Sequence, residues 1–219
     1  MNNIIIFLGL CCTNSVNLRN FFIHNEEIHN LHDHKDNFLS LARSLETSEF
    51  KMKFSEEKNN IIKKIKQYND KKNFYLGDVG ILSYVDVKNN DIYEGIERVS
   101  ALKDKNFNTK IILTVRNQSD YIKTYYSQQY YKLYELNPKF KSFSYFIKNA
   151  GNKFYESINF NKIYKKLIQK FDKENVKILL YEDFLNEPSK INKDICEFLN
   201  IRIKSNKFIG NKKTRSKKL

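Results

Sequence analysis

The feature that most constrains this chain is an apolar segment that leads directly into a helix-like pattern. Residues 111–115 form a short run of β-branched and aliphatic side chains, which is typical of a strand buried on both faces. The run stops at Arg116. Either Asn117 or Ser119 can cap a following helix, and Asp120 suits its first turn. Because a buried strand followed at once by a helix is the repeating unit of α/β proteins, the segment predicts that class of fold.

The start of this helix is also the first candidate binding site. Ligands of α/β sheets bind where the strands end and the helices begin, and Arg116 stands at that point. Its planar set of donors suits a phosphate, and Thr124 can bring a hydroxyl group to the same anion. An arginine that only pairs with a surface carboxylate is the alternative. The helix is expected to turn one stripe toward the core, made of Ile122, Tyr126, Tyr130 and Leu133.

Strands and helices alternate along the rest of the chain. Strands are expected near residues 4–9, 74–78, 110–116 and 176–181. Helices are expected over residues 55–70, 143–147 and 160–171, and after Pro188. Their expected core-facing residues are Ile61, Ile62, Ile65 and Tyr68, then Phe160, Ile163, Tyr164, Leu167, Ile168 and Phe171, and finally Ile191, Ile195, Phe198 and Leu199.

Two segments resemble the sulfotransferase family. The run Arg116-Asn-Gln-x-Asp-x-x-x-Thr124-Tyr-Tyr is similar to the segment that holds the 3′-phosphate of 3′-phosphoadenosine-5′-phosphosulfate (PAPS). The run Ile178-Leu-Leu-Tyr-Glu-Asp-Phe-Leu, followed by Phe198-Leu-Asn-Ile, resembles a structural segment of the same family, in which Glu182 would organise the loop beneath the donor site. The resemblance implies a single α/β domain over residues 1–219, with a P-loop-type parallel sheet and a basic tail over about 202–219.

The function implied by the resemblance is transfer of a sulfuryl group from PAPS to a hydroxyl or amine. The acceptor would be a carbohydrate or a small molecule. Arg116 and Thr124 would hold the 3′-phosphate, with Lys212, Lys213 and Arg215 as further candidates. The chemistry is an in-line displacement at sulfur that needs a base and positive charge near the leaving phosphate, and it requires no metal.

The loop after the first strand departs from the family pattern. Sulfotransferases read Gly-x-Pro-Lys-x-Gly-Thr-Thr-x-Leu here, and only Gly9 and Leu18 match. The replaced positions are Cys11 for Pro, Cys12 for Lys, Asn14 for the second Gly, and Ser15 and Val16 for the two Thr. We expect the donor's 5′ side to contact Gly9, Cys12, Thr13, Asn14 and Ser15, with less positive charge than usual. Arg19 is a candidate substitute for the lysine, and a turn that binds no ligand is the alternative.

The sequence identifies the general base less well than it identifies the residues that would bind the donor. Family members often carry Ser-Asp-Glu or Ser-Ser-Glu after the second strand, where this chain has Gly77-Asp78-Val79. Asp78 is therefore the candidate base. On an extended strand, however, its side chain would point away from the direction of the missing Glu. An Asp that serves only in a turn is the alternative.

The charge favours an anionic ligand but fits other partners too. The formal net charge is +14, and residues 202–219 contain eight Lys or Arg and no acid. An excess of positive charge suits a ligand that carries phosphates. It is also compatible with a basic protein that binds nucleic acid in a salt-dependent way. No nucleic-acid motif accompanies the charge, so nucleic acid is not the expected partner. A sulfotransferase-like nucleotide-binding protein with weakened or absent catalysis is a further alternative.

Histidine and cysteine spacing argues against a metal site and against disulfides. The four histidines, His24, His29, His32 and His34, fit neither zinc-finger nor zinc-protease spacing, and a polar surface loop is expected there. The three cysteines, Cys11, Cys12 and Cys196, form neither a disulfide framework nor a metal pattern, which fits a reducing compartment. The apolar N-terminus lacks the basic residues and cleavage site of a signal peptide, and no stretch is long enough to span a membrane. A cytoplasmic location is expected.

Overall fold

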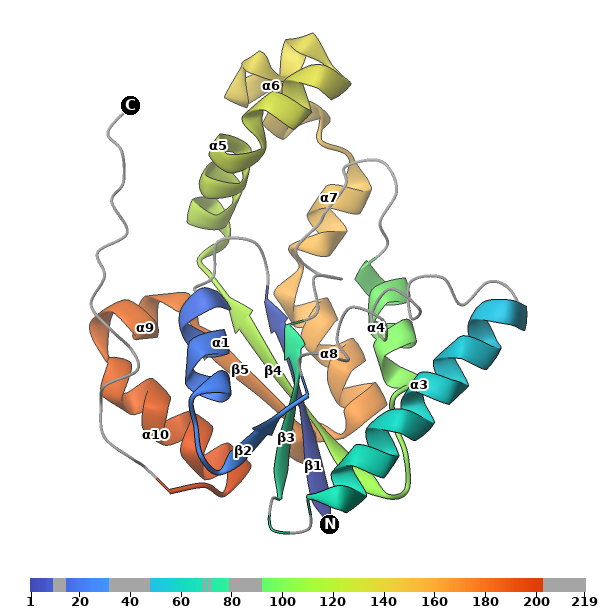
Figure 1. Ribbon diagram of the computed structural model, residues 1–219. Helices are drawn as coiled ribbons and strands as arrows, with labels where there is room; N and C mark the ends of the chain where they lie inside the picture. The colour runs from blue at the N-terminus through green and yellow to red at the C-terminus, as the bar shows by residue number, and fades with distance from the viewer. Residues whose placement is uncertain (10–14, 32–47, 69, 71, 79–91, 203–219) are drawn as a thin grey trace.

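A parallel sheet forms the centre of the molecule (Figure 1). The computed structural model describes residues 1–9, 15–31, 48–68, 70, 72–78 and 92–202. These residues form a five-stranded sheet of order β2-β3-β1-β4-β5, in which every neighbouring pair is parallel. The strands are β1 (Asn2–Gly9), β2 (Ile28–Asn30), β3 (Asn73–Asp78), β4 (Phe107–Val115) and β5 (Val176–Leu180).

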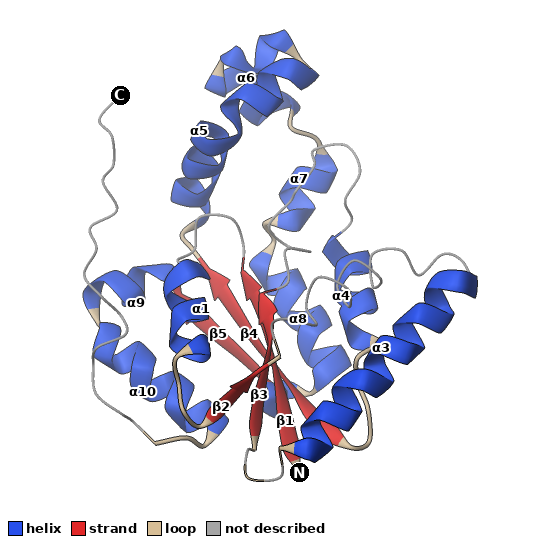
Figure 2. Cartoon of the chain, in the orientation of Figure 1, coloured by secondary structure: helices blue, strands red, loops and turns tan. Residues whose placement is uncertain are grey.

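Helices cover both faces of this sheet (Figure 2). One face is covered by α1 (Ser15–Ile23), α9 (Tyr181–Asn186) and α10 (Pro188–Leu199). The other is covered mainly by α3 (Ser48–Gln67), α4 (Ile92–Ser100) and α8 (Phe160–Phe171). The remaining helices, α5 (Gln118–Leu136), α6 (Phe143–Asn149) and α7 (Asn152–Ser157), extend beyond the carboxyl edge of the sheet, with the short 3-10 turn η2 (Pro138–Lys141) between α5 and α6. A second 3-10 turn, η3 (Lys173–Asn175), leads into β5 at the opposite edge.

The strands alternate between the two cores, as strand geometry requires. In β1, Ile4 and Ile6 pack toward α3, α4 and α8, whereas Ile5 and Phe7 pack toward α1 and α10. Because both faces are covered, the strand reads as a continuous apolar run rather than as an alternating one. The four strands expected from the sequence are confirmed, and each observed strand end lies within three residues of the expected one.

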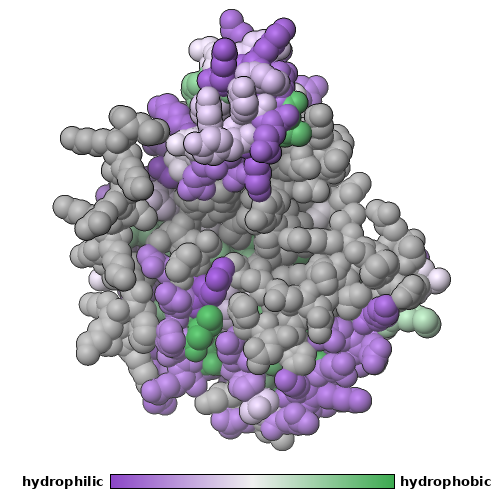
Figure 3. Space-filling view, turned by 45° about the horizontal axis from the view of Figure 1, so that its top comes forward, coloured by the Kyte–Doolittle hydropathy of each residue, from purple (hydrophilic) through white to green (hydrophobic). Residues whose placement is uncertain are grey.

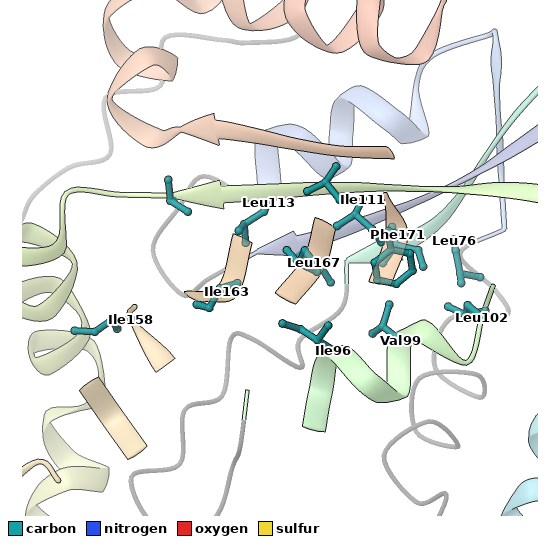
Figure 4. Close-up of a cluster of buried hydrophobic side chains, with 14 of the residues drawn as sticks. Leu76, Ile96, Val99, Leu102, Ile111, Leu113, Ile158, Ile163, Leu167 and Phe171 are labelled. Atoms are coloured by element: carbon teal, nitrogen blue, oxygen red, sulfur yellow. The ribbon is translucent and has the colours of Figure 1, made fainter. Parts of the chain in front are cut away.

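The core between the sheet and α8 confirms the helix predicted over residues 160–171 (Figure 4). Ile163, Leu167 and Phe171 are buried at spacings of four residues and face β4 and α4, where Ile96 and Val99 complete the cluster. The apolar stripe of an amphipathic helix therefore identified the buried face correctly here.

The core-facing stripe of α5 agrees with the expectation at Leu133, which is buried, but differs at the tyrosines. Tyr121 and Tyr125 are buried, whereas Tyr126 and Tyr130 are only half-buried. The reason is that α5 packs on two sides. Tyr125 lies toward Phe154 of α7, with ring centroids 5.3 Å apart, while the hydroxyl of Tyr126 donates to the carbonyls of η2.

The segment from His24 to Tyr68 also departs from the sequence expectation. The helix predicted over residues 55–70 begins at Ser48 and ends at Gln67. Tyr68 was expected to face the core, but it is exposed and stacks on His29, with ring centroids 3.7 Å apart. His29 lies in the edge strand β2 rather than in a loop, and His32 and His34 fall outside the described residues.

Replacing Tyr125 with alanine tests the observed stripe. Tyr125 is only 3% exposed, so Tyr125→Ala should lower the free energy of unfolding by about 3–5 kcal/mol, as other aromatic truncations in cores do. Tyr131→Ala, on the same helix at 80% exposure, is the matched control and should stay within about 0.5 kcal/mol of wild type. Urea denaturation measures both. Equal losses would contradict the packing of α5.

The contact between α4 and α8 includes an ionic cluster around Glu97. Lys166 Nζ lies 2.6 Å from Glu97 Oε1, and Lys170 Nζ lies 2.5 Å from Oε2. Hydrogen bonds from Lys166 and then from Lys170 hold the pKa of Glu97 below its ordinary value. Because the folded-state pKa is the lower one, the stabilisation is present above the unfolded-state pKa. It is lost as the pH falls through the folded-state value.

The variant Glu97→Gln should therefore be less stable than wild type at pH 7. This difference in unfolding free energy should shrink as the pH is lowered through the carboxyl range, because wild-type Glu97 then becomes neutral as well. Denaturant titrations between pH 7 and acid measure the trend. Glu56→Gln, at an exposed position of α3, is the control and should show little difference at any pH. A deficit for Glu97→Gln that persists in acid would contradict the ionic explanation.

Candidate functional site

The candidate site lies at the carboxyl edge of the sheet, between β1 and β4. The helix after β1 covers one face of the sheet, whereas the chain after β4 continues to α8 on the other face. In open α/β sheets, ligands bind in the crevice outside the strand ends at such a reversal. Gly9 ends β1 and pairs with Thr114, so the start of the first loop lies beside the end of β4.

Asn117 caps the helix that begins at this crevice. Its side-chain oxygen accepts from the backbone N–H groups of Ser119, at 3.0 Å, and Asp120, at 3.4 Å. The sequence left open whether Asn117 or Ser119 caps the helix, and the structure shows that Asn117 does. Asp120 lies in the first turn as expected. Because the cap satisfies these two N–H groups, an anion at this position depends on neighbouring side chains more than on the helix end itself.

Glu182 ties this helix start to the neighbouring strand end. The backbone N–H of Asn117 donates to Glu182 Oε1 at 2.9 Å. Glu182 belongs to the first turn of α9, which follows β5 directly. The contact joins two junctions that are 65 residues apart in sequence, and it gives Glu182 the structural role expected of it.

The guanidinium of Arg116 lies over the ring of Tyr181. The Arg116 Cζ atom is 4.5 Å from the centroid of that ring. Parallel pairing of Val115 with Leu180 brings the two residues together, since each follows its strand by one position. This cation–π contact holds the guanidinium close to the ring, and the planar fork of N–H donors of an arginine suits a bidentate anion.

Thr124 stands two turns into α5 and is half-buried. Its hydroxyl donates to the backbone carbonyl of Asp120 at 2.8 Å. A threonine hydroxyl rotates and carries two acceptor lone pairs, so it can exchange this intrahelical bond for one to a ligand. A side-chain amide fixes the helix nearby: Gln118 Nε2 donates to the carbonyl of Ile158 at 2.8 Å.

The positions of the remaining predicted site residues follow from the strands and helices that contain them. Asp78 is the last residue of β3 and pairs with Phe7, so it lies at the same edge as Gly9. Ser15 is the first residue of α1. The other predicted donor contacts, Cys12, Thr13, Asn14, Lys212, Lys213 and Arg215, lie outside the described residues.

Tyr181 is the site residue that sequence reasoning did not assign. The sequence pattern predicts only that Tyr181 ends a strand. An aromatic residue at the end of a strand that neighbours the Arg116 strand is a signal that could have identified it as a partner of Arg116. Within the described ranges, no three His, Cys, Asp or Glu side chains are grouped as a metal site would require. None of the helices described there is both long enough and apolar enough to cross a membrane.

We compared the chain with models of protein families and with solved structures. Residues 44–218 match the family model described as "Sulfotransferase domain". A sulfotransferase from Alicyclobacillus acidocaldarius superposes with a TM-score of 0.55 at 15% identity, over 90% of this chain and 81% of that one. The sulfotransferase domain of the curacin biosynthetic pathway gives 0.55 at 15% identity, over 93% of this chain and 76% of that one.

A third structure extends the likeness. The sulfotransferase domain of the Synechococcus PCC 7002 olefin synthase gives a TM-score of 0.56 at 15% identity, over 93% of this chain and 74% of that one. No curated protein sequence matches the chain. At this level of identity the structural likeness concerns the fold alone, and it confirms the expected α/β fold with a P-loop-type parallel sheet.

Replacing Asn117 tests the cap at the start of α5. Asn117→Ala removes the acceptor for two backbone N–H groups and should lower the free energy of unfolding by about 0.5–2 kcal/mol. Asn117→Ser keeps a capping oxygen and should lose only a fraction of that amount. Both are measured by urea denaturation. If the alanine and serine variants are equally stable, the cap does not hold this junction.

Proposed function

Because the chain belongs to the sulfotransferase family, we propose that it transfers a sulfuryl group from PAPS to a hydroxyl or amine of a carbohydrate or small-molecule acceptor. The observation that carries the proposal is the position of Arg116. It follows β4 at the carboxyl edge of the sheet, lies over the ring of Tyr181, and precedes Thr124 by eight residues. The same fold and family model support a transferase.

In this proposal Arg116 and Thr124 bind the 3′-phosphate of the donor. The capped helix start makes side chains the main donors here, and a guanidinium held beside the Tyr181 ring suits a tetrahedral anion with paired oxygens. Thr124 would turn its hydroxyl from the Asp120 carbonyl toward the phosphate. Selectivity for the 3′-phosphate would then arise from these two residues.

The 5′ side of the donor would lie between the ends of β1 and α1. Gly9 and Ser15 bound this space, and Cys12, Thr13 and Asn14 belong to the connecting loop. The first turn of α1 supplies a partial positive charge that favours the phosphosulfate. Asp78, at the end of the adjacent β3, is the proposed base that takes the acceptor proton.

The replacement of the family lysine by Cys12 favours a second candidate, a nucleotide-binding protein with weakened or absent catalysis. A thiol supplies no positive charge to the leaving phosphate. Losing one contact that stabilises the transition state typically costs about 2.7–4 kcal/mol, or ~10²–10³ in rate. Both candidates require the same donor site, and both fit a reducing cytoplasm as the proposed location.

Binding of adenosine 3′,5′-bisphosphate tests the donor site in both candidates. Wild type should bind it in a calorimetric titration and should bind 5′-AMP much more weakly. Arg116→Ala should weaken bisphosphate binding by about tenfold or more, because charge-assisted hydrogen bonds are worth about 1.5–3 kcal/mol.

Lys165→Ala is the matched control, since it removes one positive charge from an exposed position of α8. It should leave the affinity nearly unchanged. Equal losses in the two variants, or a steep salt dependence without preference for the 3′-phosphate, would point instead to general polyanion binding. An acceptor screen with PAPS then separates an active enzyme from a nucleotide-binding relative.

A further inference from the structure

A helical arm made of α5, η2 and α6 rises from the carboxyl edge of the sheet, and α6 lies in its far part (Figure 1). The arm has a small core of its own. The rings of Tyr126 and Phe143 lie 5.0 Å apart, and the hydroxyl oxygen of Tyr126 lies 2.9 Å from the carbonyl oxygen of Phe140 and 2.8 Å from that of Lys141. These contacts hold the turn after α5 in place beside the helix.

The last turns of α5 and the turn that follows present a group of exposed side chains that we call the arm end. Leu133 and Phe140 are buried beneath it and anchor its backbone. All its members come from eleven consecutive residues, so they lie close together around the end of the helix. They are the aromatic and apolar residues Tyr131, Tyr134, Leu136 and Pro138, the basic residues Lys132, Lys139 and Lys141, and the acid Glu135.

The arm end is positively charged. Residues 121–155 contain six Lys and a single acid, and in the arm end three Lys against that one acid leave a net charge of +2. Nearer the sheet, Lys123 pairs with Asp120, with 3.8 Å between Nζ and Oδ1. By contrast, no carboxylate of the described residues forms an ion pair with Lys139 or Lys141. Their charge is therefore available to an anionic partner.

The arm end also exposes large apolar groups beside these charges. Tyr131 is 80% exposed, Tyr134 is 46% exposed and Leu136 is 39% exposed. A tyrosine combines an apolar ring with a polar tip, and a lysine combines an apolar stem with a charged end. Both suit the boundary between lipid headgroups and acyl chains, where the apolar part is buried and the polar tip stays hydrated.

A nucleic acid fits the arm end less well than a lipid surface does. A polyanion would attract the lysines, and a base can stack on a tyrosine ring, but Leu136 and Pro138 would stay in water. Single strands are usually bound along a positively charged groove. The arm instead stands above the rest of the surface, with hydrophilic, intermediate and some hydrophobic side chains on the side shown (Figure 3). A bilayer would cover the apolar groups and attract the lysines together.

We infer that the arm end docks on the surface of an anionic lipid bilayer. Tyr131, Tyr134 and Leu136 lie at the interface, and the lysines contact the headgroups. The contact is reversible, because it rests on a few side chains. It also orients the molecule: the arm and the candidate site lie at the same edge of the sheet, so the site faces the bilayer. Docking requires neither a bound donor nor sulfuryl transfer, so it is independent of the proposed function.

The sequence contains no Trp, which allows a direct test in the full chain. Tyr131→Trp places a single indole in the arm end. Met52→Trp, at 70% exposure on α3, is the matched control. Vesicles of equal parts phosphatidylcholine and phosphatidylserine should shift the emission of the Tyr131→Trp variant to shorter wavelength, and lipids brominated on the acyl chains should quench it. The emission of the Met52→Trp variant should change little.

Two double variants separate the arm end from the overall charge of the chain. Lys139→Gln/Lys141→Gln should weaken binding to the same vesicles by at least about tenfold in co-sedimentation, because each lysine near an anionic surface contributes about fivefold. Lys63→Gln/Lys66→Gln removes the same charge from exposed positions of α3 and should weaken binding by less than about threefold. Vesicles of phosphatidylcholine alone should bind the wild type much more weakly.

Several outcomes would overturn the inference: equal losses in the two double variants, an emission shift in both Trp variants or in neither, or vesicle binding that is unchanged in Tyr131→Ala/Leu136→Ala. An emission shift of the Tyr131→Trp variant with single-stranded DNA but not with vesicles would identify a nucleic acid as the partner instead. Vesicle docking in a wild type that does not bind adenosine 3′,5′-bisphosphate would reject the proposed function and retain the arm end as a docking surface.

Discussion

The candidate site depends on one hydrogen bond between two strand ends. The backbone N–H of Asn117 donates to Glu182, and this contact fixes the start of α5 against the start of α9. The parallel register of β4 and β5 places Arg116 beside Tyr181, and the cation–π contact with this ring then holds the guanidinium in place. The orientation of the principal cationic group is therefore a consequence of strand pairing and one carboxylate.

The same junction bears on the anion binding that we propose, and it sets the direction of α5. Because Asn117 caps α5, two N–H groups of the helix end are already satisfied. Recognition then rests on side chains, which are more selective for geometry than a bare helix terminus. The cap also fixes the direction in which α5 leaves the sheet, and with it the position of Thr124.

Local sequence patterns predicted β1, β3, β4 and β5, the α8 stripe and the position of Arg116, but not the short edge strand β2. Each depends on the neighbours of a residue in the chain: an apolar run for a strand covered on both faces, or a spacing of three and four for a helix. The family resemblance added the pairing of Arg116 with Thr124. The roles of Cys12, Thr13, Asn14, Ser15 and Asp78 stay predictions, because they depend on side-chain positions in the loops and strand ends of the crevice.

The sequence by itself determined four of the five strands described, the α8 helix, and that Arg116 lies at the end of a buried strand. Only the tertiary structure decided that Tyr125 rather than Tyr126 is buried, that Tyr181 lies under Arg116, and that His29 joins the edge of the sheet. The reason is physical. Periodicity reports the apolar faces of one element, whereas burial of a particular side chain depends on distant segments, such as α7 for Tyr125 and β5 for Arg116, that pack against it.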